Sequence, residues 1–188
     1  MKVKGDDCFD LNCIDNITKY ILAHLFVEKR TIKKCIEFLS QIKTTCYNQI
    51  LTKYYIKKYS KEKKKRLIIF VCDKFANYKT AFMKLFGRVF KLNFGILIAY
   101  KKHGVKHNNN AIERYNGKTK DRIKNIRSGL KSFGDAINFM SLMGVIHNFV
   151  NANQELQEKT PAEVAGINLK LGRNKILGLA RYLAKRRR

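Results

Sequence analysis

The segment HNNNAIERYNGKTKDR, residues 107–122, places one carboxylate, Glu113, at the start of a strongly basic stretch. Six lysines and arginines lie from Arg114 to Arg127, and Asp121 is the only acid among them. Glu113 is either a salt-bridge partner or a metal ligand for phosphate chemistry. In such chemistry two divalent ions about 3.5–4 Å apart activate the attacking oxygen and stabilise the leaving oxygen. Carboxylates suit Mg²⁺ as ligands.

A second carboxylate, Asp73, ends the apolar run LIIFVC at residues 67–72. It is the only acid between Glu62 and Glu113. A continuous apolar run of this length is typical of a strand buried on both faces, and α/β sheets bind ligands at the carboxyl ends of their strands. A turn-forming aspartate is the structural alternative. We predict that Asp73 and Glu113 are metal ligands of one catalytic site.

Helical spacing relates Glu113 to the bases that follow it. Lys120, Lys124 and Arg127 lie at +7, +11 and +14, so they share the face of Glu113 on a helix. Charge pairing along a helix prefers +3 and +4, where the sequence has asparagine and glycine. A helix dipole alone would also favour an acid in the first turn. The spacing favours a metal site at one end of a DNA-binding surface.

The composition indicates a folded protein with a polyanionic partner. The chain has 188 residues, 45% of them apolar, and a net charge of +26 from 40 basic and 14 acidic residues. This apolar content supports a packed core, and nucleic acid is the leading partner for so much positive charge. An anionic membrane is the alternative, through the basic C-terminal segment. No apolar run approaches the roughly 20 residues of a spanning helix.

The cysteines and the N-terminal sequence indicate where in the cell the protein is located. Five cysteines form no CxxC pair, and the mixed sequence at the N-terminus has no apolar signal-peptide core. We therefore expect reduced core thiols in a cytoplasmic, nucleoid-associated protein without a membrane role.

Hydrophobic periodicity and helix-end residues predict the order of elements. Three N-terminal strands, with a tight turn at Asp15–Asn16, are followed by alternating helices and strands. The predicted strands cover 1–5, 7–15, 19–30, 67–73 and 94–100. The predicted helices run from 32 to a charged loop at 57–66, over 77–87, 111–127 and 133–152, from 161 for a short stretch, and along the basic C-terminus. Thr31 is the expected N-cap of the first helix, Gly87 is expected to end the second, and Thr160 with Glu163 is expected to form a capping box at 161. On the helix at 111–127, one face is lined by Ile112, Thr119, Ile123 and Ile126.

This order favours an α/β fold, with a mixed sheet flanked by helices. A three-strand meander followed by alternating helices and strands is the element order of a ribonuclease-H-like fold. We predict this fold for residues 1–152 and a basic helical extension for residues 153–188.

Several motifs, taken in order, resemble the catalytic domain of DDE transposases from small prokaryotic insertion sequences, which are relatives of retroviral integrases. The motifs are VCDKFANYKTAF, HNNNAIERYNGKTKDR, IHNFVN and KTPAEVAGI. The most specific are T-P-A-E-x-A-G-I and N-x-x-E-R, the latter formed by Asn110, Glu113 and Arg114 with Lys120 following. Asp73 precedes Glu113 by 39 intervening residues. The similarity is to archaeal members of the insertion-sequence-six group and runs along almost the whole chain.

The resemblance implies that Asp73 and Glu113 are the second and third members of the DDE triad. They would bind two Mg²⁺ (or Mn²⁺) ions for hydrolysis at the transposon end and for attack by its 3′-hydroxyl on target DNA. The implied partners are transposon ends, target DNA and further copies of the chain in a homo-oligomer. The predicted DNA contacts are Asn110, Arg114, Lys120, Lys124 and Arg127.

The first aspartate of the triad has no counterpart in the matching position. In this family it precedes a segment similar to KVKG, and Met1 stands just past that point. Asp6, Asp7, Asp10 and Asp15 are alternatives, but they fall on the following turn and strand. We therefore expect a transposase that lacks its amino-terminal part, with a truncated first strand. Such a polypeptide binds DNA and shows little or no strand transfer.

Two alternatives fit part of the pattern. One is a basic nucleic-acid-binding protein without catalysis, which the charge and the 21 tyrosines and phenylalanines favour equally. The other is a different ribonuclease-H-like nuclease, for example a Holliday-junction resolvase, which the T-P-A-E-x-A-G-I motif disfavours. A pure binder does not need Asp73, so Asp73→Asn would leave its DNA affinity unchanged or higher, and metal would have no effect.

Overall fold

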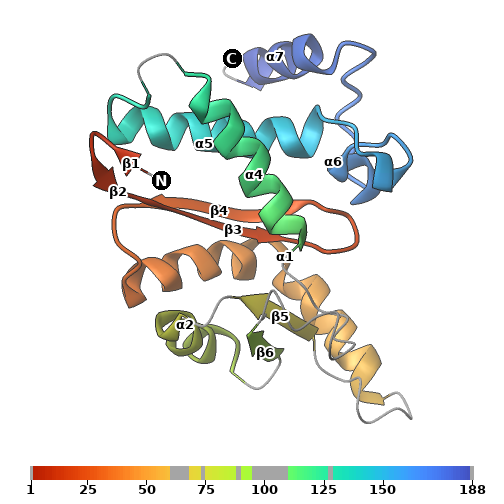
Figure 1. Cartoon of the computed structure of the whole chain (residues 1–188). Helices are drawn as coiled ribbons and strands as arrows, with labels where there is room; N and C mark the ends of the chain where they lie inside the picture. The colour runs from red at the N-terminus through yellow and green to blue at the C-terminus, as the bar shows by residue number, and fades with distance from the viewer. Residues whose placement is uncertain are drawn as a thin grey trace.

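A computed structural model of the chain describes residues 2–59, 68–72, 75–87, 90–94, 110–126 and 129–186. These residues form a mixed α/β structure, as predicted (Figure 1). The strands are β1 (Lys2–Val3), β2 (Asp6–Asp7), β3 (Phe9–Ile14), β4 (Ile21–Val27), β5 (Ile68–Cys72) and β6 (Phe90–Phe94). The helices are α1 (Ile32–Tyr59), α2 (Ala76–Phe86), α4 (Asn110–Lys124), α5 (Phe133–Phe149), the 3₁₀ helix η2 (Gln154–Leu156), α6 (Pro161–Val164) and α7 (Lys175–Arg186).

The described strands pair two by two. β1 pairs with β2 and β3 pairs with β4, both antiparallel, whereas β5 and β6 are parallel. Because Cys8 alone separates β2 from β3, the first four strands follow the path predicted for the three-strand meander. Among the described residues they do not join β5 and β6 in one sheet, so the predicted single mixed sheet is not confirmed. α1 contacts both β4 and β5, so helix packing connects the two pairs.

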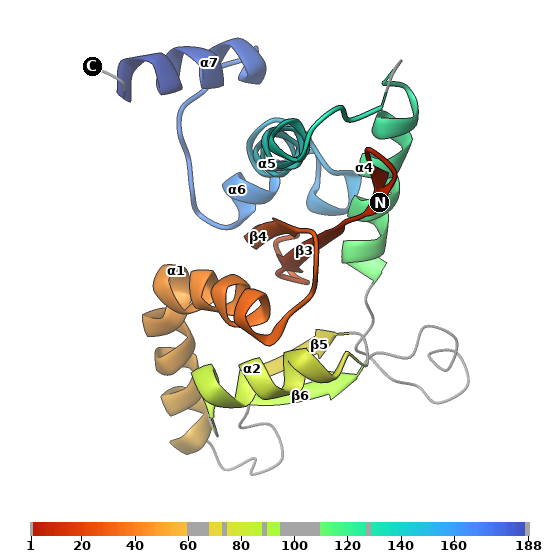
Figure 2. The same ribbon diagram turned by 90° about the vertical axis from the view of Figure 1, so that its left-hand side faces the viewer.

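The β3–β4 hairpin lies between two layers of helices (Figures 1 and 2). α1 packs on one face, and α4 and α5 pack on the other. The alternation of the strands creates these two faces, since successive side chains point to opposite sides. Leu11, Ala23 and Val27 belong to the core shared with α1 and α2. Phe26 points the other way, into a second core with Met140 of α5.

Three predicted helix ends are confirmed. The Thr31 hydroxyl accepts a hydrogen bond from the backbone N–H of Lys34 at 3.3 Å, where α1 starts. Gly87 ends α2 with φ +52, a conformation that favours glycine because it has no Cβ. At the start of α6, the side chains of Thr160 and Glu163 each accept a hydrogen bond from the other's backbone N–H, which is a capping box.

Three element boundaries differ from the predicted ones. α1 continues through Tyr59, into the segment predicted to be a charged loop. β6 shares only Phe94 with the strand predicted at 94–100, because residues 90–94 are the ones in register with β5. Residues 95–100 lie outside the described residues. α4 ends at Lys124, before the predicted end at 127.

Three of the five cysteines, Cys8, Cys35 and Cys46, are buried, as expected for core residues. Burial raises the pKa of Cys13 to about 12, and Cys46 and Asp15 act in the same direction. None of the described helices has the length and apolar character needed to cross a membrane.

Two contacts hold α7 to the segments that directly precede it in the chain. Lys175 Nζ, at the start of α7, donates to both carboxylate oxygens of Glu163 at 2.9 Å. This hydrogen bond, with that from the Thr160 backbone, lowers the pKa of Glu163 to about 2. Further along α7, Gly178 lies against the backbone of Leu171, so closely that an added Cβ would stand 2.0 Å from its carbonyl oxygen.

We expect Gly178→Ala to displace α7 and to lower the free energy of unfolding by about 1–3 kcal/mol, as overpacking does elsewhere. The atoms that clash with the added Cβ belong to the Leu171 backbone and not to a flexible side chain, so no change of rotamer relieves the clash. Urea unfolding and limited trypsin digestion measure the effect. Gly117→Ala in α4 is the matched control, because nothing lies within 4 Å of its added Cβ and alanine is the better helix former. Equal stability of the two variants would contradict the close packing.

Candidate nucleic-acid interface

α4 is fixed in place by one buried face. Tyr115 and Thr119, one turn apart, are 3% and 2% exposed, and the Thr119 hydroxyl donates to the Tyr115 carbonyl oxygen at 3.0 Å. Ile123, a turn further on, packs against the second core. Thr119 and Ile123 were predicted on this face, whereas Tyr115 was not. The remaining surface of the helix is left for basic side chains.

The exposed basic side chains of α4 form what we call the cationic face. Asp121 is exposed among them and lies 3.5 Å from Lys124 Nζ, an exposed pair of the kind that contributes little to stability. The cationic face consists of Arg114, Lys118, Lys120, Arg122 and Lys124. A row of bases on one helix is the electrostatic pattern that phosphate contacts require.

Glu113 is partly exposed in the first turn of α4. Within the described part of the chain, no hydrogen bond or ion pair involves its carboxylate. In both views α4 begins on the side of the molecule that carries β5 and β6, and it runs away from them (Figures 1 and 2).

Three of the predicted site residues cannot be placed with their side chains. Asp73, Arg127 and the side chain of Asn110 lie outside the described residues. β5 ends at Cys72, so Asp73 directly follows the carboxyl end of a strand, as predicted. The meeting of Asp73 with Glu113 stays a prediction.

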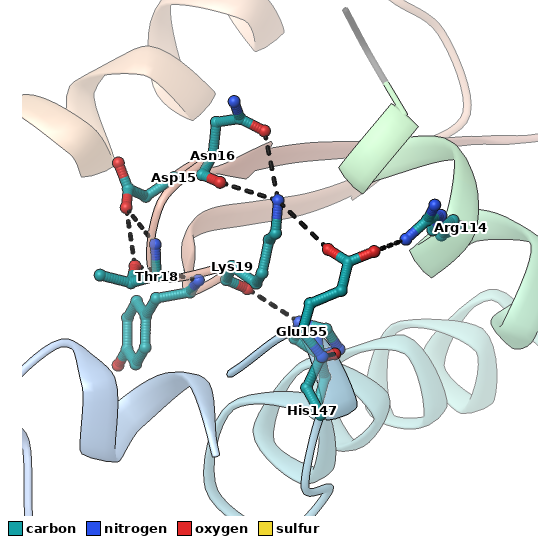
Figure 3. A network of polar contacts seen from close by, with 9 residues as sticks. Asp15, Asn16, Thr18, Lys19, Arg114, His147 and Glu155 are labelled. Carbon is teal, nitrogen blue, oxygen red and sulfur yellow. Dashed lines mark hydrogen bonds and ion pairs between the residues drawn. The ribbon is translucent and has the colours of Figure 1, made fainter. Parts of the chain in front are cut away.

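Arg114 takes part in a network of ion pairs within the chain (Figure 3). It pairs with Glu155 of η2, and the second Glu155 oxygen lies 3.7 Å from Lys19 Nζ. Lys19 Nζ also donates to the backbone oxygen of Asn16 at 2.8 Å. Arg114 thus ties α4 to the β3–β4 turn and to η2, while 65% of its side chain stays exposed.

His147 of α5 links this network to the packed interior. Its Nε2 donates to the carbonyl oxygen of Lys19 at 2.9 Å. Its ring meets that of Tyr115 edge to face, with centroids 5.1 Å apart. Burial lowers the pKa of His147, the hydrogen bond to the Lys19 backbone opposes this shift, and the charge of Lys118 adds to it. The lowered pKa favours the neutral ring, which acts here as a structural donor.

The acids considered as alternatives to the first DDE aspartate have other partners or positions. Asp15 Oδ2 accepts hydrogen bonds from the backbone and hydroxyl of Thr18 at 2.7 and 2.8 Å, which closes the predicted turn. The Asp10 side chain is 12% exposed and lies against His24 within the β3–β4 hairpin. Asp6 and Asp7 are exposed on β2. In the described residues, no group of three or more His, Cys, Asp or Glu side chains is placed to hold a metal.

Asp10 belongs to a buried polar cluster that we did not predict. Its Oδ1 lies 2.7 Å from His24 Nε2, and its Oδ2 accepts from Asn12 Nδ2 at 2.6 Å. The Asp10–His24 contact is misaligned for a hydrogen bond, and the Tyr115 hydroxyl has no partner among the described groups. Burial, followed by the charge of Asp10, raises the pKa of Tyr115 to about 12. Alternating polar residues on two paired strands were the available sequence signal.

A magnesium or manganese ion fits this site only in part. The Glu113 carboxylate is a hard oxygen donor, and it has no partner among the described residues, which suits Mg²⁺. The second ligand in our prediction is Asp73. The acids of β2 and β3 add no further donor to Glu113 in the described structure.

Comparisons of the chain with models of known protein families, with curated protein sequences and with solved structures gave no match. The fold and the site define a mixed α/β protein with a cationic helix, whose first turn carries a glutamate without a partner among the described residues.

Proposed function

We propose that this chain is the DNA-binding catalytic domain of a DDE-type transposase with a ribonuclease-H-like arrangement of its elements. The observation that carries the proposal is the surface of α4. Its bases are exposed while Tyr115 and Thr119 fix the helix from behind. The N-x-x-E-R motif lies in the first turns of this helix, so Glu113 stands at one end of the cationic face.

The cationic face binds the phosphates of DNA in this proposal. Lys120 and Lys124 lie seven and eleven residues after Glu113, about 10 and 16 Å along the helix axis at 1.5 Å per residue. Arg114 has a narrower role, because its guanidinium is already paired with Glu155. It holds the start of α4 in place and offers its exposed edge to a phosphate.

Asp73 and Glu113 would hold the divalent ion, which would supply charge stabilisation at the phosphate and activation of the attacking oxygen. The position of Glu113 in the first turn of α4 puts that carboxylate at one end of the cationic face. Family members use three carboxylates. Because Asp10 and Asp15 are engaged within the hairpin, we expect DNA binding to persist and strand transfer to be weak.

The test is to measure binding and joining with one preparation. The purified 188-residue chain is titrated against duplex DNA over a range of salt concentrations. It is then incubated with labelled DNA ends and a plasmid target in Mg²⁺ and in Mn²⁺. We expect salt-dependent binding with little or no joined product. Robust joining would refute the expected loss of activity, and an absence of DNA binding would refute the proposed function.

A basic nucleic-acid-binding protein without catalysis is the second candidate. It is favoured by the pairing of Asp10 and Asp15 inside the hairpin, since neither is left to serve as a catalytic acid. Asp73→Asn separates the two candidates. A binder without catalysis keeps or gains DNA affinity in this variant regardless of metal, whereas the transposase domain loses its response to Mg²⁺.

A further inference from the structure

The C-terminal part of α1 extends beyond the packed body of the protein. The buried side chains of this helix end at Ile50, although the helix continues to Tyr59. Nine further residues at 1.5 Å each add about 13 Å of helix. In both views these last turns extend past α2 and the β5–β6 pair (Figures 1 and 2).

This extension, residues 53–59, is called the α1 tip, and it exposes large apolar side chains. Tyr55 is 50% exposed, Ile56 67% and Tyr59 79%. The rings also contact each other and the adjacent bases. Tyr54 and Tyr55 lie edge to face with centroids 5.6 Å apart, and Lys58 Nζ lies 6.0 Å from the centre of the Tyr59 ring.

The charge of the α1 tip selects among possible partners. No acid occurs between Glu37 and Glu62, whereas Lys53, Lys57 and Lys58 are interleaved with the tyrosines. A second copy of the chain would bring its own positive charge of +26 to the contact. A partner with negative charge and flat apolar surfaces fits both properties, and unpaired nucleotides have both.

We propose that the α1 tip binds single-stranded nucleic acid. Tyr55 and Tyr59 present their rings to two unpaired bases, and Lys58, three residues after Tyr55 and so on the same side of the helix, pairs with a phosphate. One helical turn separates the rings, about 6 Å along the axis, so each base has its own stacking partner. In a duplex the bases are paired and stacked, so only its phosphates can contact the α1 tip. The inference rests on the proposed DNA binding and adds the strand form that this surface recognises.

The test compares Tyr55→Ala/Tyr59→Ala with Tyr55→Phe/Tyr59→Phe. Each variant is titrated by fluorescence anisotropy against oligothymidylate and against a duplex of the same length, at one salt concentration. Stacking on one aromatic ring is worth about 1–3 kcal/mol by alanine substitution, which is about fivefold or more in affinity. We expect the alanine variant to lose at least about tenfold for the single strand and less than about twofold for the duplex. The phenylalanine variant keeps the wild-type values.

Three other outcomes would contradict the inference. If the wild type binds duplex and the alanine variant binds the single strand as well as the wild type does, this inference fails and the proposed function stands. If the wild type binds neither form, both fail. If the alanine variant instead converts a dimer to a monomer in sedimentation, the α1 tip is a self-association surface and the inference is overturned. Far-ultraviolet circular dichroism of both variants verifies that α1 remains helical.

Discussion

Replacing Lys118, Lys120 and Lys124 by glutamate is expected to reduce the affinity for duplex DNA by about 100-fold or more at moderate salt. Each lysine lost from a phosphate removes one released counterion, and each glutamate adds repulsion. The slope of log affinity against log salt should therefore fall by about three units. Anisotropy titrations at several salt concentrations measure both quantities. All three side chains are exposed, so the fold should survive the change.

A matched triple variant separates the position of the charges from their number. Lys33 on α1 and Lys79 and Lys84 on α2 are also exposed, and their replacement by glutamate changes the net charge by the same amount. We expect this second variant to lose less than about fivefold, since it alters only the long-range field. Equal losses in the two variants would mean that DNA binds to the overall charge of the chain and not to α4.

A large effect on stability is expected at the polar cluster of Asp10 and His24. His24→Ala leaves the mostly buried Asp10 carboxylate without the group that lies 2.7 Å from its Oδ1. Leaving a mostly buried polar atom without its neighbour costs about 1–3 kcal/mol, and the hydrogen bond from Asn12 remains. Urea unfolding should show this loss as a lower midpoint with an unchanged slope.

Two further variants test whether the loss of stability comes from the contact between Asp10 and His24. Asp10→Asn combined with His24→Ala should recover part of the loss, since the buried charge is gone. Asp121→Asn removes an exposed pair, with 74% of the side chain accessible, and should change stability by less than about 1 kcal/mol. A loss in His24→Ala no larger than that in Asp121→Asn would show that the Asp10–His24 contact does not contribute to stability.

Local signals predicted the elements of this fold well. The apolar residues of α1 recur at helical spacing, and the capping residues Thr31 and Thr160 act within the first turn of their helices. Both signals can be read from residues that are close in the sequence. The arrangement of strands into sheets was harder to predict. Strand pairing depends on contacts between distant segments, and the parallel register of Ile68 with Phe90 has no local signature.

The candidate site could be predicted only where one helix determines it. The spacing of Lys120 and Lys124 from Glu113 follows from helical geometry, and the structure leaves all three side chains at least partly exposed. The pairing of Arg114 with Glu155 depends on a contact between residues 41 positions apart. Local spacing holds no information about such a contact, and the buried Asp10–His24 pair was missed for the same reason.

The proposed function depends most on Glu113 as a metal ligand at the start of a DNA-binding helix. The direct measurement is the DNA affinity of Glu113→Gln and Asp121→Asn, each in Mg²⁺ and in Na⁺ at matched ionic strength. Both variants remove one negative charge from α4. We predict that Asp121→Asn keeps the Mg²⁺ response of the wild type, whereas Glu113→Gln loses it. An identical Mg²⁺ response in the two variants would contradict the account, because Glu113 would then be an ordinary acid at the start of a helix.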